Sequence, residues 1–310
     1  MSTLNLTLEG LDDAAAYASS KPKKASKLSI PWINSLGQPH KTPAASRLAG
    51  TTDYTAAKVA AILQEFLQPD SKTSLEKAAE SLLFLISANA SEYAEVYSFG
   101  EICVEFAEQI PYHHPSQLKL ARLLKYLSRS PKFDSKPNLP PKERLHHCYQ
   151  LLGESIRDNF NGSDTEHPEY WVNFHAFVAN FYETGVFGAQ PGYALWMMRD
   201  SFEEKMPKEA CEQDLNVMAA AQWIIWYGQS LFKLILYGDD QDEDENAKES
   251  WRFGKQYTGP LIQRRSVERW RYWKQCFQLI VSDTDSSDEC KKLASRSANL
   301  MDAIEKSMIF

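Results

Sequence analysis

One local pattern repeats from residue 52 to the end of the chain, and it constrains the fold more than any other feature. Apolar residues recur at helical spacing, and the segments that carry them stop before Pro69, Pro111, Pro131 and Pro207. No run rich in Val, Ile and Thr alternates apolar and polar residues, and no hairpin signal joins two such runs. The sequence therefore predicts an all-α fold of about ten helices, arranged as a bundle or an irregular helical array.

Three helix starts carry capping residues. Thr52 or Asp53 precedes the first periodic segment, Thr73-x-x-Glu76 forms a capping-box pattern, and Ser266 precedes a late segment. We expect helices within residues 53–67, 73–90, 91–110, 115–130, 140–160, 167–182, 191–206, 211–236, 266–281 and 288–310.

Residues 1–51 lack this periodicity and are rich in Ser, Lys and Pro. They hold six basic and three acidic residues, a net charge of +3, so the remainder carries −10 of a total of −7. Such a segment cannot bury enough apolar surface to offset its ordering entropy, and we expect a disordered leader. Its lysines, Lys21 to Lys27, form either a weak nuclear-localisation patch or, more simply, a solvating tail. We expect residues 52–310 to form a single all-α domain with a mobile acidic loop at 238–265.

Cysteine usage and targeting signals bear on where the chain resides. The five cysteines lie far apart and form no Cys-x-x-Cys pair, which is typical of a reducing compartment. The first residues, MSTLNLTLEGLDD, contain neither part of a secretory signal. Residues 217–236 are strongly apolar, but Gln222, Gln229 and Lys233 interrupt them at helical spacing, so we expect a core helix and no membrane association. The expected location is the cytoplasm, the nucleus or both.

The stretch RRSVERWRYWKQCF, residues 264–277, interleaves basic and aromatic residues and raises the question of nucleic-acid binding. On a helix that begins after Ser266, one arc carries Trp270, Trp273, Cys276, Phe277 and Ile280, and the other carries Glu268, Arg271, Lys274, Gln275 and Gln278. A nucleic-acid surface needs stacking rings and cations on the same face. The separation predicts a core helix and no nucleic-acid partner. Arg269, at the margin of the apolar arc, is expected to pair with a carboxylate or to stack on a tryptophan.

The acidic segment from Asp239 to Glu249 imitates two metal motifs. Its aspartates resemble the start of a calcium-binding EF-hand loop, but Glu245 stands where glycine is needed and Trp251 where a closing glutamate is needed. Asp239-Asp240-x-x-Glu243 also resembles the aspartate-rich motif of class I terpene synthases, without a second metal motif after it. The histidines have no zinc-site spacing. We therefore expect no metal site, no cofactor and no catalytic residue.

Several polar residues fall on otherwise apolar helix faces. Asn173 and Asn180 are seven residues apart on one face, and Arg157 and Asp158 flank Asn159 on the stripe of another helix. Buried amides and charges need partners. These residues form either an interhelical hydrogen-bond network or the lining of a ligand-binding crevice. The candidate lining residues are Arg157, Asp158, Asn173, Asn180 and Arg269.

Several segments resemble a family in order and wording: HHPSQLKLARLL, LLGESIRDNFNG, EYWVNFHAFVANF, YALWMMRDSFE, AAAQWIIWYGQSLF and SVERWRYWKQCF. The chain resembles, from about Thr52 to Ile280, the fungal proteins grouped as domain of unknown function 3632. The most specific piece is a Ser-x-Glu-Arg-Trp-x-x-Trp-Lys signature. The resemblance implies a helical intracellular protein and no established activity. It carries over these motif members without a role: Arg157, Asp158, Asn159, Trp171, Asn173, Trp196, Arg269, Trp270 and Trp273.

Two classes of function follow from these observations. The first is a non-enzymatic intracellular protein that binds partner proteins on a helical groove. The second is an enzyme or small-ligand binder with a polar crevice between helices, and metal-dependent prenyl chemistry is a remote third. A deep pocket with converging polar groups favours the second class, and an exposed apolar groove favours the first.

Overall fold

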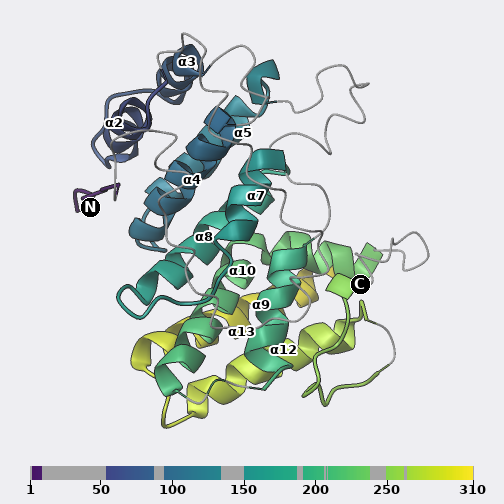
Figure 1. Ribbon diagram of the computed structural model, residues 1–310. Helices are drawn as coiled ribbons and strands as arrows, with labels where there is room; N and C mark the ends of the chain where they lie inside the picture. Colours follow the sequence, from purple (N-terminus) through teal and green to yellow (C-terminus); the bar gives the residue numbers. More distant parts are fainter. Residues whose placement is uncertain are drawn as a thin grey trace. The chain divides into compact units, whose positions relative to one another are not determined.

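A computed structural model of the chain describes residues 2–8, 54–86, 94–133, 150–186, 191–205, 207, 209–237, 249–261 and 264–309. Within these residues there are ten α-helices, one short 3-10 helix at Pro131–Phe133, and no strand (Figure 1). The predicted all-α class is confirmed. The predictions made for residues 9–53 of the leader and for the acidic residues 238–248 lie outside the described residues.

The chain divides into two compact units. Unit 1 consists of Met1–Gly162 and Thr184–Gly188, and unit 2 consists of Ser163–Glu183 and Ala189–Phe310. The single domain expected over residues 52–310 stays a prediction.

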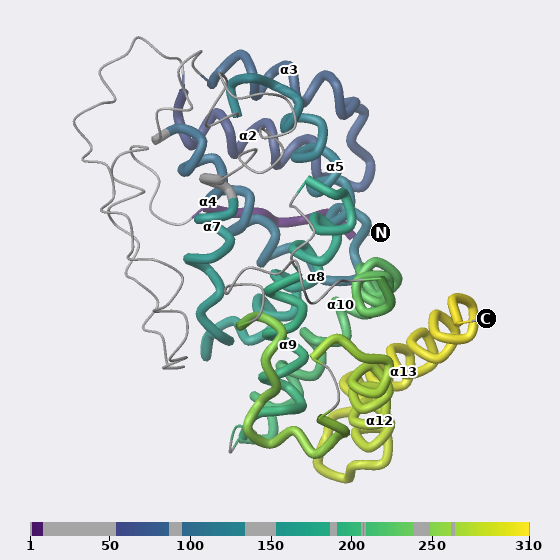
Figure 2. The backbone as a smooth tube through the Cα atoms, turned by 90° about the vertical axis from the view of Figure 1, so that its right-hand side faces the viewer, coloured from purple at the N-terminus to yellow at the C-terminus, as the bar shows by residue number. Residues whose placement is uncertain are grey.

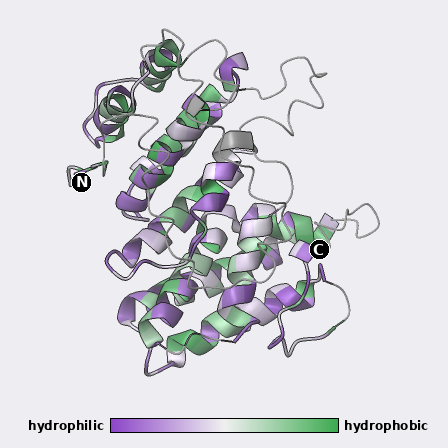
Figure 3. Ribbon diagram, viewed as in Figure 1, coloured by the Kyte–Doolittle hydropathy of each residue, from purple (hydrophilic) through white to green (hydrophobic). Residues whose placement is uncertain are grey.

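Unit 1 packs around the helix α4 (Ala94–Gln109), which contacts α7 (Gln150–Asp158) and α2 (Ala56–Leu67). The helix α3 (Leu75–Leu85) lies against α5 (Ser116–Leu127) and α2. Green hydrophobic and purple hydrophilic residues share helices such as α4 and α5 (Figure 3). The hydrophobic side chains of α4 enter the core, where Phe99, Ile102 and Phe106 have no exposed surface. The predicted helical periodicity corresponds to one buried face on α2 and α3, whereas α4 is buried on almost every side.

Hydroxyl side chains set the starts of α2 and α3. Thr55 Oγ1 accepts a hydrogen bond from Lys58 N, and Ser74 Oγ accepts one from Lys77 N, each at 3.2 Å. The caps predicted upstream, at Thr52 or Asp53 and at Thr73, were wrong. Neighbouring Ser, Thr and Asp residues have similar capping propensities, so spacing alone does not select among them.

Unit 2 packs around the long helix α10 (Ala210–Tyr237). This helix contacts α8 (Glu169–Glu183), α9 (Gly192–Phe202), α12 (Val267–Ser282) and α13 (Asp288–Met308) (Figures 1 and 2). Trp223, Ile224, Leu231 and Phe232 of α10 are completely buried, which confirms the expected core helix. No helix among the described residues has the length and apolar character needed to cross a membrane.

The segment between α10 and α12 differs from expectation. Residues 238–265 were predicted to form a mobile loop, but residues 249–261 pack closely onto unit 2, and Trp251 has no exposed surface. The segment has no helical period, so the sequence pattern carries no sign of its burial. Long-range contacts fix it instead, as described below.

Candidate functional site

The candidate site is built on the first turns of α12. Ser266 Oγ accepts a hydrogen bond from Arg269 N at 3.2 Å and caps the helix, as predicted. From there Arg269, Trp270, Trp273 and Phe277 all point into unit 2 and are buried. The interpretation of this stretch as a core helix is confirmed for these residues.

The opposite arc of α12 faces α13, which alters one expectation. Arg271 is 53% exposed and its Nε lies 2.6 Å from Glu305 Oε1. Lys274 was predicted to lie on a solvent arc, but its side chain is only 17% exposed and its Nζ lies 3.2 Å from Asp302 Oδ1 and 3.4 Å from Glu305 Oε2. The packing of α13 along α12 supplies these carboxylates, which the sequence of α12 does not reveal.

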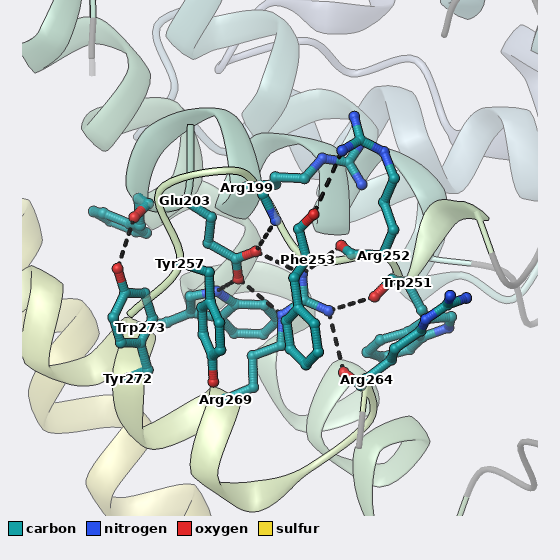
Figure 4. Close-up of polar contacts among 12 residues, drawn as sticks. Arg199, Glu203, Trp251, Arg252, Phe253, Tyr257, Arg264, Arg269, Tyr272 and Trp273 are labelled. Atoms are coloured by element: carbon teal, nitrogen blue, oxygen red, sulfur yellow. Dashed lines mark hydrogen bonds and ion pairs between the residues drawn. The ribbon is translucent and has the colours of Figure 1, made fainter. Parts of the chain in front are cut away.

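The Arg269 guanidinium is at the centre of the site, and all five of its N–H groups are used (Figure 4). Its Nε donates to Glu203 Oε1 and its Nη2 to Glu203 Oε2, both at 2.8 Å. Its Nη1 donates to the carbonyl oxygens of Trp251 at 2.6 Å and Arg264 at 3.1 Å, and its Nη2 also donates to that of Arg252 at 2.9 Å. The expectation that Arg269 pairs with a carboxylate is therefore met by a bidentate pair.

Glu203, the C-cap residue of α9, is the acidic half of this pair and has no exposed surface. Its Oε1 also accepts a hydrogen bond from Trp273 Nε1 at 2.7 Å, and its Oε2 accepts one from Gly254 N at 2.9 Å. Its main-chain carbonyl accepts a hydrogen bond from Gln256 N at 2.7 Å. The carboxylate thus receives four hydrogen bonds, which is what a buried ionised group requires.

Two aromatic rings lie close to the Arg269 guanidinium. The Arg269 guanidinium lies 4.8 Å from the ring centre of Phe253 and 5.1 Å from that of Trp273. Tyr257 stacks on Phe253 with ring centres 4.5 Å apart (Figure 4). Cation–π contact and exclusion of water strengthen the pair.

We name the residues Glu203, Trp251, Gly254, Arg269 and Trp273 the Arg269 centre. The guanidinium of Arg269 and the carboxylate of Glu203 are fully hydrogen-bonded within the centre, whereas the buried indole N–H of Trp251 has no hydrogen-bond partner. The centre joins the end of α9, the segment 249–261 and the start of α12. The Arg269 centre therefore connects segments of unit 2 that lie far apart in the sequence.

A rim of further charges lies beside the centre. Arg252 forms ion pairs with Glu249 at 2.7 Å and with Glu204 at 3.4 Å. Arg199 donates to the carbonyl of Ser250 at 3.3 Å, and burial, followed by the charge of Arg252, lowers its pKa to about 10. Burial also raises the pKa of Asp200 to about 6. These groups are held in mutual contacts as well.

The five crevice candidates fall in different units. Arg157 and Asp158 end α7 in unit 1, where Arg157 Nη2 lies 3.0 Å from Asp158 Oδ1 and the two side chains are 30% and 44% exposed. The Tyr97 hydroxyl donates to Asp158 Oδ2 at 3.1 Å. Their neighbour Asn159 donates to Glu101 Oε1 at 3.1 Å, so this stripe is a network between α7 and α4.

Asn173 and Asn180 lie on α8 in unit 2, together with Arg269 on α12. Both asparagines are 4% exposed, and Asn180 Nδ2 donates to Ala176 O within its own helix at 2.8 Å. The five N–H groups of the Arg269 guanidinium donate to other residues, and Arg269 hydrogen-bonds to neither asparagine. A ligand crevice lined by these residues stays a prediction.

Two hydrogen bonds between side chains join α8 to α10, and the sequence pattern predicts neither of them. Trp223 Nε1 donates to His175 Nδ1 at 2.8 Å, and Trp171 Nε1 donates to Asn216 Oδ1 at 3.2 Å. Complete burial lowers the pKa of the His175 imidazole to about 3. His175 is thus neutral at pH 7 and acts as a hydrogen-bond acceptor within the aromatic core.

A second candidate site lies in unit 1, where residues 2–8 run beside α2 and α4 (Figure 2). Gln68 pairs with the main chain of Leu4: its Oε1 accepts from Leu4 N and its Nε2 donates to Leu4 O, each at 3.0 Å. Gln109 does the same with Thr7, accepting from its N at 2.8 Å and donating to its O at 2.7 Å. Two glutamine side chains therefore act as strand-like partners for an extended main chain.

The side chains of this segment alternate between core and solvent. Leu4 and Leu6 are 8% and 5% exposed, whereas Thr3, Asn5 and Thr7 face solvent. Residues 2–8 were counted in the disordered leader, and the structure corrects that boundary. The alternation of Leu4, Leu6 and Leu8 in the sequence was the signal that could have identified an extended, docked segment.

Gln64 completes the surface that holds this segment by donating from Nε2 to Leu6 O at 2.7 Å. We name Gln64, Gln68 and Gln109 the glutamine face, and residues 2–8 the arm. Five hydrogen bonds from the glutamine face reach the main chain of the arm.

Among the residues that the structure describes, no group of three or more His, Cys, Asp or Glu side chains could hold a metal ion. The acidic residues Asp239 to Glu245, which imitate metal motifs in the sequence, lie outside the described part of the chain.

Comparison with known proteins assigns the chain to a family. The model of a family described as "Protein of unknown function (DUF3632)" matches residues 101–277. No curated protein and no solved structure matches the chain. The matched range includes the whole Arg269 centre and Gln109, whereas the arm lies before it. Because the match extends over more than half of its residues, the chain belongs to the DUF3632 family of proteins of unknown function.

Proposed function

We propose that the chain is a non-enzymatic protein of the cytoplasm or nucleus that binds a partner protein through the glutamine face of unit 1. The observation that carries this proposal is the mode in which that face holds an extended segment. Five hydrogen bonds go to main-chain atoms of the segment, and only two side chains, Leu4 and Leu6, are buried.

Main-chain recognition of an extended segment is a general way to bind peptides. In strand addition, main-chain hydrogen bonds provide affinity and pockets for alternate side chains provide specificity. The glutamine face reproduces both elements without a β-sheet, because the amide groups of Gln68 and Gln109 each present one donor and one acceptor to a residue.

The Arg269 centre supports a non-enzymatic role. Arg269 and Trp273 belong to the most specific part of the motif, and both hydrogen-bond to Glu203 inside unit 2. A catalytic centre needs groups whose hydrogen-bonding capacity is completed by substrate. The motif thus supports a scaffold that keeps its shape while another surface does the binding.

The test uses the full chain with its own arm released by the double substitution Leu4→Asp and Leu6→Asp. A fluorescent peptide STLNLTL, the sequence of residues 2–8, is titrated into this variant and its anisotropy is measured. We expect saturable binding in the micromolar range or tighter. A flat titration would contradict the proposed function.

A second pair of variants shows whether binding occurs at the proposed face. Adding Gln68→Ala and Gln109→Ala to the arm-released chain should abolish peptide binding. Gln275→Ala and Gln278→Ala, at exposed positions of α12 in unit 2, serve as the matched control and should leave it unchanged.

A further inference from the structure

The arm occupies the surface that a partner would need. We infer that the arm is an intramolecular competitor for the glutamine face, and that the partner segment has its chemistry: extended, with apolar side chains two residues apart and free N–H groups at two defined positions. This inference rests on the proposed function and adds the regulation and the specificity of the same site.

The side-chain part of the specificity follows from burial in the arm. The leucines at positions 4 and 6 are the two residues of the arm withdrawn from solvent, and the residue between them, Asn5, is exposed. Alternate residues of an extended chain point to opposite sides, so a competing segment must present its apolar residues at positions i and i+2.

The main-chain part of the specificity follows from the two glutamine pairs. Leu4 N and Thr7 N donate to Gln68 Oε1 and Gln109 Oε1. A proline at either of these positions has no N–H to donate and is excluded. Asn5 N makes no hydrogen bond to the described part of unit 1, so proline or N-methylation is tolerated there.

The arm is suited to exchange because nothing in its docking is unique to it. Any extended segment carries the same main-chain groups, and leucine is a common side chain. Residues 9–53 separate the arm from the rest of unit 1 along the sequence.

Competition predicts a difference between two full-length proteins. Wild-type protein should bind the labelled STLNLTL peptide about tenfold more weakly than the Leu4→Asp/Leu6→Asp variant, which corresponds to an arm that is docked about nine-tenths of the time. The substitutions lie outside the glutamine face, and a gain of affinity cannot arise from a loss of folding. The substitutions Thr3→Ala and Asn5→Ala, at exposed arm positions, should leave the wild-type affinity unchanged.

Modified peptides test the main-chain specificity on the arm-released variant. N-methylation at the position of Leu4 or of Thr7 should weaken binding by at least about tenfold, the effect of losing one hydrogen bond and leaving its acceptor unpaired. N-methylation at Asn5 should have little effect. Equal losses at all three positions would overturn the assignment of the two glutamine pairs.

Two further outcomes separate the hypotheses. If the arm-released variant binds the peptide and wild-type protein binds it equally well, the competition is refuted while the proposed function survives. If wild-type protein is a dimer that the Leu4→Asp/Leu6→Asp substitutions convert to a monomer, the arm of a second copy occupies the face, and the intramolecular competition is overturned. Sedimentation velocity at the concentrations of the titrations measures this directly.

Discussion

The carboxylate of Glu203 and the guanidinium of Arg269 meet in two hydrogen bonds of 2.8 Å, with 0% and 1% of their side chains exposed. Removing two charges from water costs several kcal/mol for each ion, and only complete pairing and hydrogen bonding offset that cost. The four hydrogen bonds to Glu203 and the five from Arg269 meet this condition. Removing one partner should therefore destabilise the protein by much more than the intact pair stabilises it.

Breaking the pair should destabilise unit 2 strongly. Glu203→Gln keeps the side-chain shape but leaves the Arg269 charge buried without a counter-charge, and we expect a loss of about 3–5 kcal/mol in the free energy of unfolding. Urea denaturation followed by circular dichroism measures it. Arg252→Ala is the control, because its ion pairs lie on a 25% exposed side chain and should contribute no more than about 1 kcal/mol. Equal losses for the two variants would contradict the central role of the pair.

Gly254 should tolerate no side chain. A Cβ atom at this position would overlap the main-chain oxygen of Glu203, which cannot move without breaking the hydrogen bonds around it. Gly254→Ala should therefore destabilise the protein by more than about 2 kcal/mol, measured as a lower thermal midpoint. Gly192→Ala is a matched control, since its Cβ would meet Trp196 at an ordinary 3.5 Å. A Gly254→Ala protein as stable as the Gly192→Ala protein would refute the close approach.

The two arcs of α12 should respond differently to substitution. Trp270 is completely buried, its Nε1 donates to Met301 O at 3.3 Å, and Trp270→Ala should cost about 3–5 kcal/mol. Arg271 pairs with Glu305 at the surface, and Arg271→Ala should cost less than about 1 kcal/mol. Chemical denaturation of both variants compares the costs. A stable Trp270→Ala protein that loses affinity for an oligonucleotide would instead support a nucleic-acid interface.

The buried imidazole of His175 should make stability depend on pH. Its pKa is lowered from 6.5 to about 3 in the folded state, so the unfolded state binds the extra proton as the pH falls. Stability conferred by the neutral imidazole is complete above pH 6.5 and is lost toward the folded pKa. Between pH 7.5 and pH 5 this group alone should remove about 2 kcal/mol.

A matched variant isolates that contribution. His175→Gln retains an acceptor for Trp223 Nε1 and does not titrate. Asp200 has a raised pKa of about 6 and therefore gains stability over the same interval, with the opposite sign, but it is present in both proteins and cancels. The stability difference between wild type and His175→Gln should shrink by about 2 kcal/mol from pH 7.5 to pH 5. A constant difference would mean that His175 is accessible to protons in the folded state.

The arm should contribute little to overall stability. An arm that is docked about nine-tenths of the time adds only about 1.4 kcal/mol to the free energy of unfolding. The Leu4→Asp/Leu6→Asp variant should thus unfold within about 2 kcal/mol of wild type, and a larger loss would indicate an arm that cannot exchange.

Helical periodicity predicted most of the fold because it reports which face of a helix is buried. It placed Trp270, Trp273 and Phe277 in the core, and it identified Ser266 as a cap. Periodicity does not report what lies on the other side of the contact. The partner of Arg269 is a glutamate 66 residues earlier, and no local pattern connects the two.

The burial of segments without helical periodicity could not be predicted from the sequence, for a related reason. Trp251 stands after a run of acidic residues and was assigned to a mobile loop, although the Arg269 centre draws it into the core. Lys274 was placed in solvent because α13 could not be positioned from sequence. The arm was missed because its leucines alternate over only a few residues, and because its docking depends on glutamines that are unremarkable in α2 and α4.

The spacing of the Arg269 centre along the chain has a consequence for protein synthesis. Glu203 emerges from the ribosome first, and its partners follow between 51 and 70 residues later. Until then its carboxylate stays hydrated, because burying it alone would be too costly. The end of α9 can thus reach its final place only after Trp273 has been synthesised. By then most of unit 2 has already been translated. Any truncation before that residue would leave a charged helix end facing water and an exposed aromatic segment for chaperones to recognise.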